Sequence, residues 1–154
     1  MKTFLCLAVV LGAGVGVSLT LATAGGVKRS DSVVKVKARL DKAAPPGKAV
    51  VVVSLDIQPG WHLYANPVGN EEWEQSRVLV KVTGADAKVE YPPPGRVLKD
   101  AKLGSFNIYE NKVDIRATVD RVPTEANPLQ LTVRLSSCDD KECLPPSTVK
   151  VSVP

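Results

Sequence analysis

The stretch Lys48-Ala49-Val50-Val51-Val52-Val53-Ser54-Leu55-Asp56-Ile57 is a near-continuous apolar run dominated by valine. Branched side chains of this kind favour β-strands. Turn-forming residues bound the run, with Ala44-Pro45-Pro46-Gly47 before it and Pro59-Gly60 after it. A strand that is apolar on both faces is typical of the centre of a sheet. The sequence therefore predicts a central strand over 48–57.

Shorter runs rich in Val, Ile, Leu and Thr lie on both sides of this strand, and turns separate them. Several alternate apolar and polar residues, as in 129–136, where Leu131, Val133 and Leu135 share one face. Their recurrence predicts an all-β sandwich of about seven to nine short strands. The further predicted strands are Ser32–Leu40, Trp61–Ala65, Arg77–Val82, Ala87–Tyr91, Phe106–Glu110, Lys112–Val119, Leu129–Ser136 and Thr148–Val153.

Two longer connections carry no strand pattern. Asn66–Ser76 is polar, and a helical turn is expected at Glu71–Gln75. Pro92–Gly104 opens with Pro92-Pro93-Pro94-Gly95 and is expected to be irregular. No internal repeat and no second core are predicted.

The N-terminus has the pattern of a secretory signal peptide. Lys2 precedes an uncharged apolar run, and Ala22-Thr23-Ala24 has the A-x-A pattern of small residues that marks a signal-peptide cleavage site. An uncleaved membrane anchor is the alternative, but spanning needs roughly 20 apolar residues, and three glycines interrupt this run. We expect a signal peptide over 1–24, a domain over 25–154 and a mature protein that does not span a membrane.

Charge gives little support for nucleic-acid binding. Without Lys2 the chain keeps 19 of its 20 basic residues against 16 acidic ones, which leaves a net charge near +3. The signs are mixed along the chain, with no basic run and no interleaving of basic and aromatic residues. A solvated surface of both signs is therefore expected.

Cys138 and Cys143 are the pair that remains when Cys6 leaves with the signal peptide. In an exported chain such a pair predicts a disulfide. A four-residue spacer in a hairpin-like loop can bring the two Cα atoms within the roughly 4.4–6.8 Å that a bridge needs. So small a loop stabilises a fold by only about 2–3 kcal/mol, which favours redox chemistry. Most bridges in exported domains are structural, however, so spacing alone favours that interpretation and leaves both open.

The charges beside the pair are mostly negative. Asp139, Asp140 and Glu142 disfavour a nearby thiolate, and only Lys141 favours one. This pattern argues against an unusually stabilised thiolate. It fits a disulfide that a partner's thiolate attacks, or a dithiol that reduces a more oxidising partner.

The remaining candidates are weaker. His62 is the only histidine, and a hydrogen-bonded structural role is favoured over a metal site made with Cys138 and Cys143. We therefore expect no metal and no organic cofactor. Trp61 and Tyr64 are notable aromatic residues in a chain with few, and they are expected either to pack in the core or to shield a reactive sulfur.

Two segments together resemble the N-terminal periplasmic domain of the thiol:disulfide interchange protein DsbD. They are Gln58-Pro59-Gly60-Trp61-His62-Leu63-Tyr64-Ala65-Asn66-Pro67 and Cys138-x4-Cys143-Leu144-Pro145-Pro146, and Gly104–Val119 is similar as well. The resemblance covers most of the predicted mature chain. It implies an immunoglobulin-like β-sandwich in the periplasm with one redox-active cysteine pair.

The resemblance also implies roles for individual residues. Cys143 is implied as the attacking cysteine and Cys138 as the resolving one. His62 and Tyr64 fall where the family has aromatic residues beside the pair. Asp100–Gly104 falls where the family has a cap loop over the sulfurs. The cap's frequent aromatic residue is replaced here by Lys102 with Leu103 beside it, so shielding is expected to be looser or to use Leu103 and Phe106.

The expected function is thiol–disulfide exchange with periplasmic thiol and disulfide proteins, a protein-disulfide reductase type of activity. The printed chain holds neither a multi-span membrane domain nor a thioredoxin-like domain. A separate membrane electron donor is therefore expected, or a stand-alone relative that has lost the relay. The rival interpretation is a non-catalytic β-sandwich interaction module with a structural disulfide.

Overall fold

The structure is a computed structural model that describes residues 27–120 and 127–154. The predicted signal peptide, residues 1–24, lies outside these ranges. Within them, no helix has the length and apolar character needed to cross a membrane.

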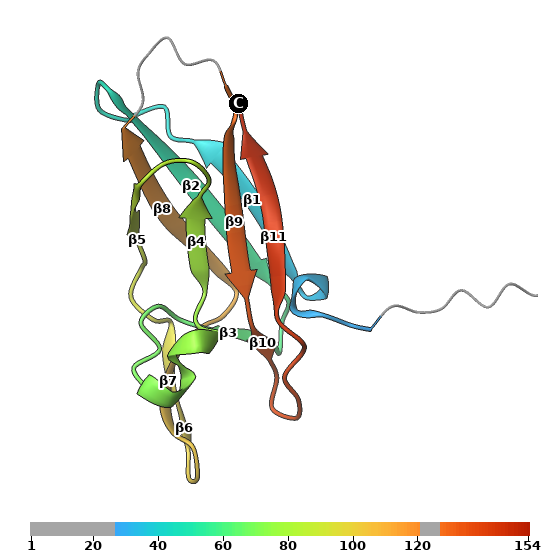
Figure 1. Cartoon of the computed structure of the whole chain (residues 1–154). Coiled ribbons are helices and arrows are strands. Elements are labelled where there is room, and N and C mark those ends of the chain that lie inside the picture. The colour runs from blue at the N-terminus through green and yellow to red at the C-terminus, as the bar shows by residue number, and fades with distance from the viewer. Residues whose placement is uncertain (1–26, 121–126) are drawn as a thin grey trace, which may run out of the picture.

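The described residues form an immunoglobulin-like β-sandwich with an additional sheet at one end (Figure 1). The strands are β1 (Val34–Leu40), β2 (Lys48–Ile57), β3 (His62–Tyr64), β4 (Leu79–Val82), β5 (Ala87–Glu90), β6 (Arg96–Asp100), β7 (Gly104–Tyr109), β8 (Lys112–Asp120), β9 (Leu129–Leu135), β10 (Ser137–Cys138) and β11 (Ser147–Val153). Two short 3-10 helices are η1 (Ser30–Ser32) and η2 (Glu71–Ser76).

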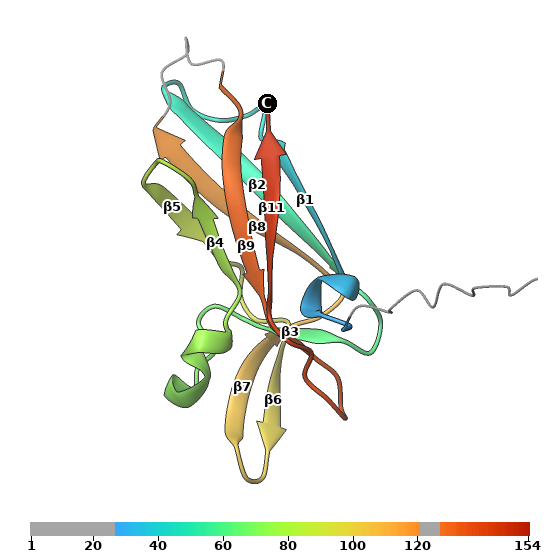
Figure 2. The same cartoon turned by 45° about the vertical axis from the view of Figure 1, so that its right-hand side comes forward.

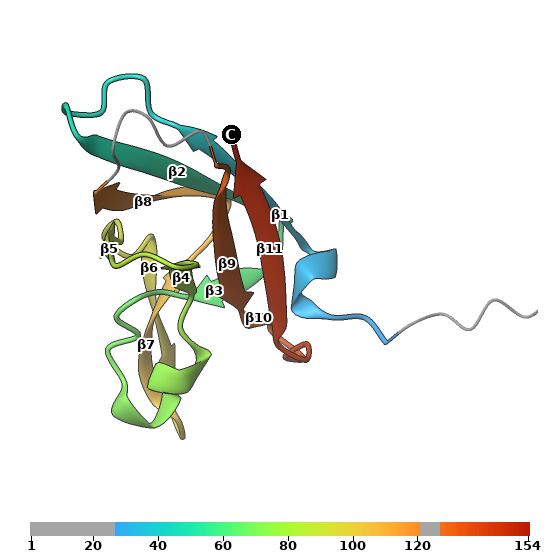
Figure 3. The same cartoon turned by 45° about the horizontal axis from the view of Figure 1, so that its top comes forward.

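Three antiparallel sheets have the strand orders β1-β2-β8-β5, β11-β9-β4 and β10-β3-β7-β6. The first two lie face to face and make the sandwich, as Figures 1 and 3 show. The third sheet, η2 and the loop between β10 and β11 lie together at the end opposite the C-terminus (Figure 2). This end carries both cysteines.

The β2 strand has the bounds predicted for 48–57 and lies in the interior of its sheet, between β1 and β8. Val51 and Val53 are fully buried in the sandwich core. Val52, on the opposite face, is also buried, between its cross-strand neighbours Arg39 and Arg116. Burial on both faces explains why the run is apolar without alternation.

The predicted sandwich is confirmed, but the described residues contain eleven strands rather than seven to nine. The prediction of an irregular Pro92–Gly104 was wrong, because this segment contains β6, which pairs with β7 along its whole length. The segment between the last two predicted strands also contains β10, which pairs with β3. Both strands are short. The partner of β10 is distant in sequence, whereas β6 forms a hairpin with the next strand, β7. The expected helical turn is confirmed as η2.

The third sheet packs on both of its faces, and this positions the cysteines. On one face Leu63 and Tyr109 join the main core. On the other, Tyr64, Phe106, Ile108 and Cys138 form a second buried cluster with Val68, against which Trp73 and Leu98 pack. Since neighbouring residues of a strand point to opposite faces, β3 places Leu63 in one core and Tyr64 in the other. Cys138 thereby lies in an apolar cluster separate from the sandwich core.

Candidate functional site

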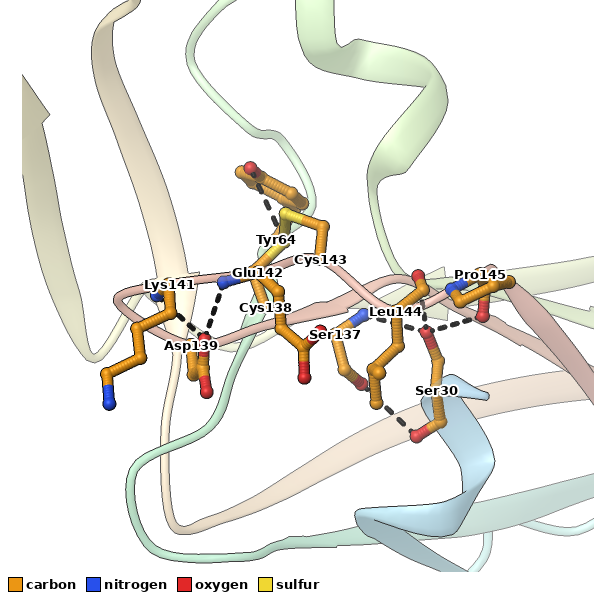
Figure 4. Close-up of a disulfide and its surroundings, with 10 residues drawn as sticks. All are labelled: Ser30, Tyr64, Ser137, Cys138, Asp139, Lys141, Glu142, Cys143, Leu144 and Pro145. Carbon is orange, nitrogen blue, oxygen red and sulfur yellow. Dashed lines mark hydrogen bonds between the residues drawn. A yellow bond between two sulfur atoms is a disulfide. The ribbon is translucent and has the colours of Figure 1, made fainter. Parts of the chain in front are cut away.

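Cys138 and Cys143 form a disulfide across a short hairpin, with their Cα atoms 4.0 Å apart. The two cysteines face each other as an antiparallel bridge. Flanking backbone hydrogen bonds run from Asp139 N to Glu142 O and from Leu144 N to Ser137 O, each 2.9 Å long. Cysteines directly opposite in such a hairpin explain a Cα distance slightly below the predicted range. Figure 4 shows this hairpin and its surroundings.

The turn of the hairpin is built by Asp139. Its carboxylate accepts hydrogen bonds from the backbone N–H groups of Lys141 (2.8 Å) and Glu142 (2.7 Å). These hydrogen bonds stabilise the charged carboxylate and hold the pKa of Asp139 below its usual value. The bond from Glu142 has the larger effect. The sequence indicated Asp139 only as a negative charge near the sulfurs. Its carboxylate also closes the turn, so the hairpin has hydrogen bonds of its own besides the disulfide.

The two cysteines differ sharply in exposure. Cys138 is 3% exposed and belongs to the second cluster. Cys143 is an exposed residue on the returning arm of the hairpin. A large partner approaching from solvent therefore reaches Cys143 first. The bridge joins one accessible cysteine to one that is shielded.

Aromatic rings surround Cys138. The Tyr64 ring packs 5.6 Å from Trp73 and 5.7 Å from Phe106, and Trp73 and Phe106 are 5.5 Å apart, measured between ring centroids. The Tyr64 hydroxyl lies 3.8 Å from Cys138 Sγ (Figure 4). Since a disulfide sulfur carries no proton, the hydroxyl is the donor. Burial raises the pKa of Tyr64, so its proton is retained at neutral pH.

His62 lies on β3 directly opposite Cys138 on β10. It is buried, and burial lowers its pKa, with the negative charge of Glu110 acting in the opposite direction. Glu110 is itself paired with Arg96 through hydrogen bonds of 3.1 and 2.8 Å. Lowering the pKa favours the neutral imidazole. Within residues 27–120 and 127–154, no three His, Cys, Asp or Glu side chains gather as a metal-binding group.

The other predicted site residues are Trp61 and the segment Asp100–Gly104. Trp61 packs against the main core, and Lys28 Nζ lies 4.4 Å from its ring centroid. Asp100–Gly104 forms the tip of the β6–β7 hairpin, where the Asp100 carboxylate accepts the N–H groups of Leu103 (2.9 Å) and Lys102 (2.7 Å). Leu103 is 49% exposed, whereas Phe106 is buried in the cluster of Cys138.

Two residues of this region were not predicted. Trp73 packs on Tyr64 and Phe106 from η2, a segment that was predicted to be a polar connection with a helical turn. A lone aromatic residue among acidic ones was the available signal. Ser30 had no signal at all, because its partners lie more than 100 residues away along the chain.

Ser30 joins both arms of the disulfide hairpin (Figure 4). Its backbone N–H and its hydroxyl both donate to Pro145 O, each at 3.0 Å. The same hydroxyl accepts the Ser137 N–H at 2.9 Å, and the Ser137 hydroxyl donates to Ser30 O at 3.2 Å. Ser30 and Ser137 are both fully buried. The arms before Cys138 and after Cys143 are therefore fixed to one residue of η1.

Replacing Ser30 with alanine is expected to lower the free energy of unfolding by about 1–3 kcal/mol, because the Ser137 N–H loses its buried acceptor. Urea titration followed by tryptophan fluorescence measures this loss. Ser32→Ala is the matched control in the same helix, since the Ser32 hydroxyl is exposed and donates to Arg29 O at 2.6 Å. Its effect should stay within about 0.5 kcal/mol. Equal losses in the two variants would contradict the assigned role of Ser30.

The family model described as "Thiol:disulfide interchange protein DsbD, N-terminal" matches residues 30–154. No curated protein matches the chain. The reduced N-terminal domain of DsbD from Neisseria meningitidis is 16% identical, with 81% of this chain and 87% of that chain covered and a TM-score of 0.52. The N-terminal periplasmic domain of ScsB from Proteus mirabilis is 21% identical, with 78% of this chain and 46% of that chain covered and a TM-score of 0.57.

At these identities the two solved structures establish a shared fold, whereas the family match spans most of the sequence and includes both bridged cysteines. The fold, the third sheet and the cysteine hairpin all lie within the matched residues. The chain therefore belongs to the family of the N-terminal domain of the thiol:disulfide interchange protein DsbD.

Proposed function

We propose that this domain exchanges its Cys138–Cys143 disulfide with thiol and disulfide proteins in the periplasm and so carries electrons between them. The observation that carries the proposal is the asymmetry of the bridge, in which Cys143 is exposed and Cys138 is buried among aromatic rings. A bridge that serves only as a staple needs no such difference. A bridge that exchanges with partners needs it, because one sulfur must be open to attack and the other must act as the leaving group.

In the first half-reaction, a thiolate of an electron donor attacks Cys143 Sγ. A mixed disulfide forms at Cys143, the bond to Cys138 breaks, and Cys138 leaves as a thiolate. A second thiolate of the donor then attacks the donor sulfur that is bonded to Cys143. A disulfide forms within the donor, and Cys143 is released as a thiolate. The donor leaves oxidised, and the domain holds two thiols and two more electrons.

In the second half-reaction, the Cys143 thiolate attacks a disulfide of an acceptor protein. The Cys138 thiolate then attacks Cys143 Sγ, re-forms the bridge and releases the reduced acceptor. Cys143 thus acts as the nucleophile and Cys138 as the resolving thiol. Both steps use the same exposed sulfur, so donor and acceptor dock at the same end of the domain.

The neighbouring residues support this chemistry by covering Cys138. In the proposal Tyr64 and His62 line the buried sulfur, and the hairpin tip Asp100–Gly104 acts as a cap. Asn70 Nδ2 holds the tip by donating to Leu103 O at 2.9 Å. Trp61 is assigned to core packing, because it contacts the main core.

We place the domain outside the cytoplasm, after cleavage of the predicted signal peptide over residues 1–24. The signal pattern supports this location, and the similar domain of ScsB is described as periplasmic. A disulfide also persists in such a compartment. The electron donor is proposed to be a membrane protein.

Reduction of the bridge under mild conditions tests the proposal against the structural alternative. All variants carry Cys6→Ser, so that Cys138 and Cys143 are the only sulfurs titrated. Reduced glutathione should open the bridge while circular dichroism stays native, because this small loop contributes only about 2 kcal/mol and the hairpin has its own hydrogen bonds. Unfolding on reduction, or a reduction potential below about −300 mV, would support a structural staple instead.

A further inference from the structure

Among the residues that the structure describes, the Tyr64 hydroxyl is the one polar side-chain group within hydrogen-bonding distance of the buried sulfur, Cys138 Sγ. The hydroxyl lies 3.8 Å from the sulfur, and both residues are nearly inaccessible to solvent, at 6% and 3% exposure. Phe106 and Trp73 hold the Tyr64 ring from two further elements, β7 and η2. The donor is therefore fixed on the sulfur before any reaction begins.

The opening of the bridge creates a charge at this place. When a thiolate R–S⁻ attacks Cys143 Sγ, the bond R–S–Sγ143 forms and the Sγ143–Sγ138 bond breaks. The electron pair of the broken bond stays on Cys138, which becomes an anion inside an apolar cluster. An unpaired anion is costly in such surroundings. Water has little access to it, so a protein donor has to stabilise it.

We propose that Tyr64 is a catalytic residue whose hydroxyl donates a hydrogen bond to the Cys138 thiolate and so stabilises the leaving group when the bridge opens at Cys143. The inference rests on the proposed function and deepens it. The hydroxyl keeps its proton throughout, so the balance of the exchange reaction is unchanged. The donor acts on developing charge, as preorganised donors do in other enzymes.

The nearby charges make this donor more important. Asp139 and Asp140 lie in the turn next to Cys138, and both of them and Glu110 act electrostatically on His62. Arg96 is occupied by Glu110, and Lys141 points away from the sulfurs in Figure 4. The neutral form of His62 is favoured, so it adds no fixed positive charge. Tyr64 is thus the donor placed against the new anion.

Tyr64→Phe removes the hydroxyl and keeps the ring. In the Cys6→Ser background, reduction of the bridge by glutathione should become about three- to tenfold slower, because a less stabilised thiolate leaves more slowly. With Cys143→Ser added, Cys138 is the remaining thiol. The pH midpoint of its thiolate absorbance should then rise by about one unit.

Tyr109→Phe is the matched control. Tyr109 is also buried in the same sheet, but its hydroxyl donates to Pro92 O at 2.8 Å and its ring belongs to the main core. This control should leave both the rate and the midpoint unchanged. A Tyr64→Phe protein that matches Tyr109→Phe in both measurements would overturn the assignment.

A fluorinated tyrosine at position 64 keeps the test decisive if Tyr64→Phe fails to fold. It retains the ring and hydroxyl and makes the donor more acidic, so the Cys138 midpoint should fall rather than rise. An unchanged midpoint would refute the role of Tyr64. Reduction of the parent domain by glutathione tests the proposed function, whereas the difference between Tyr64→Phe and the parent tests the role of Tyr64, so the two failures are distinguishable.

Discussion

Replacing Cys138 with serine should leave the domain able to attack a partner disulfide but unable to release the partner. Cys143 is exposed and keeps its reactivity, so the mixed disulfide forms. The thiol that resolves it is gone. Attack by a neighbouring group in the same molecule is faster by many orders of magnitude than attack by a separate molecule. Without the Cys138 thiol, the rate of turnover should therefore fall on the order of a thousandfold or more. The adduct should be visible on non-reducing gels and by mass spectrometry.

Cys143→Ser is the matched control, because it also leaves one thiol in the same hairpin. That thiol, Cys138, is 3% exposed and is packed among aromatic rings. It should form little or no adduct with the same protein disulfide. Equal trapping by the two variants would show that exposure does not decide which sulfur reacts, and the assigned order of attack would be wrong.

Strand prediction succeeded where local pattern and final environment agree. The β2 strand keeps its predicted bounds, and the alternation in 129–136 matches the burial of β9. It failed for β6, whose residues are mostly exposed and which follows a run of prolines. The β6 strand forms a local hairpin with β7, but it has no buried face and therefore lacks the alternation of apolar and polar residues that indicates a strand.

The site was predictable to the extent that chemistry is tied to residue type. Two cysteines close in sequence predict a bridge, whereas the place of His62 and Tyr64 beside it was implied only by the resemblance to the DsbD N-terminal domain. The exposure of Cys143 and the burial of Cys138 were not predictable, because the two differ only in how the hairpin lies on the third sheet. Ser30 was missed for the same reason, since a serine reveals nothing of a distant carbonyl until the fold brings them together.

The structure distinguishes two side chains that were expected to share the shielding of Cys138. Phe106 is 2% exposed and touches Tyr64 and Trp73, whereas Leu103 is 49% exposed at the hairpin tip. Phe106→Ala should lower the free energy of unfolding by about 3–5 kcal/mol. Leu103→Ala, the control on the same hairpin, should stay within about 0.5 kcal/mol. Urea titration measures both.

The same two variants also decide what covers the sulfur. In the Cys6→Ser, Cys143→Ser background, alkylation of Cys138 by iodoacetamide reports its access to solvent. Phe106→Ala should accelerate alkylation, because removing the ring opens the cluster around Cys138. Acceleration by Leu103→Ala alone would mean that the tip covers the sulfur and Phe106 only packs beside it. The urea titrations give the unfolded fraction of each variant, and only acceleration of alkylation beyond the rise in that fraction reports the loss of shielding in the folded domain.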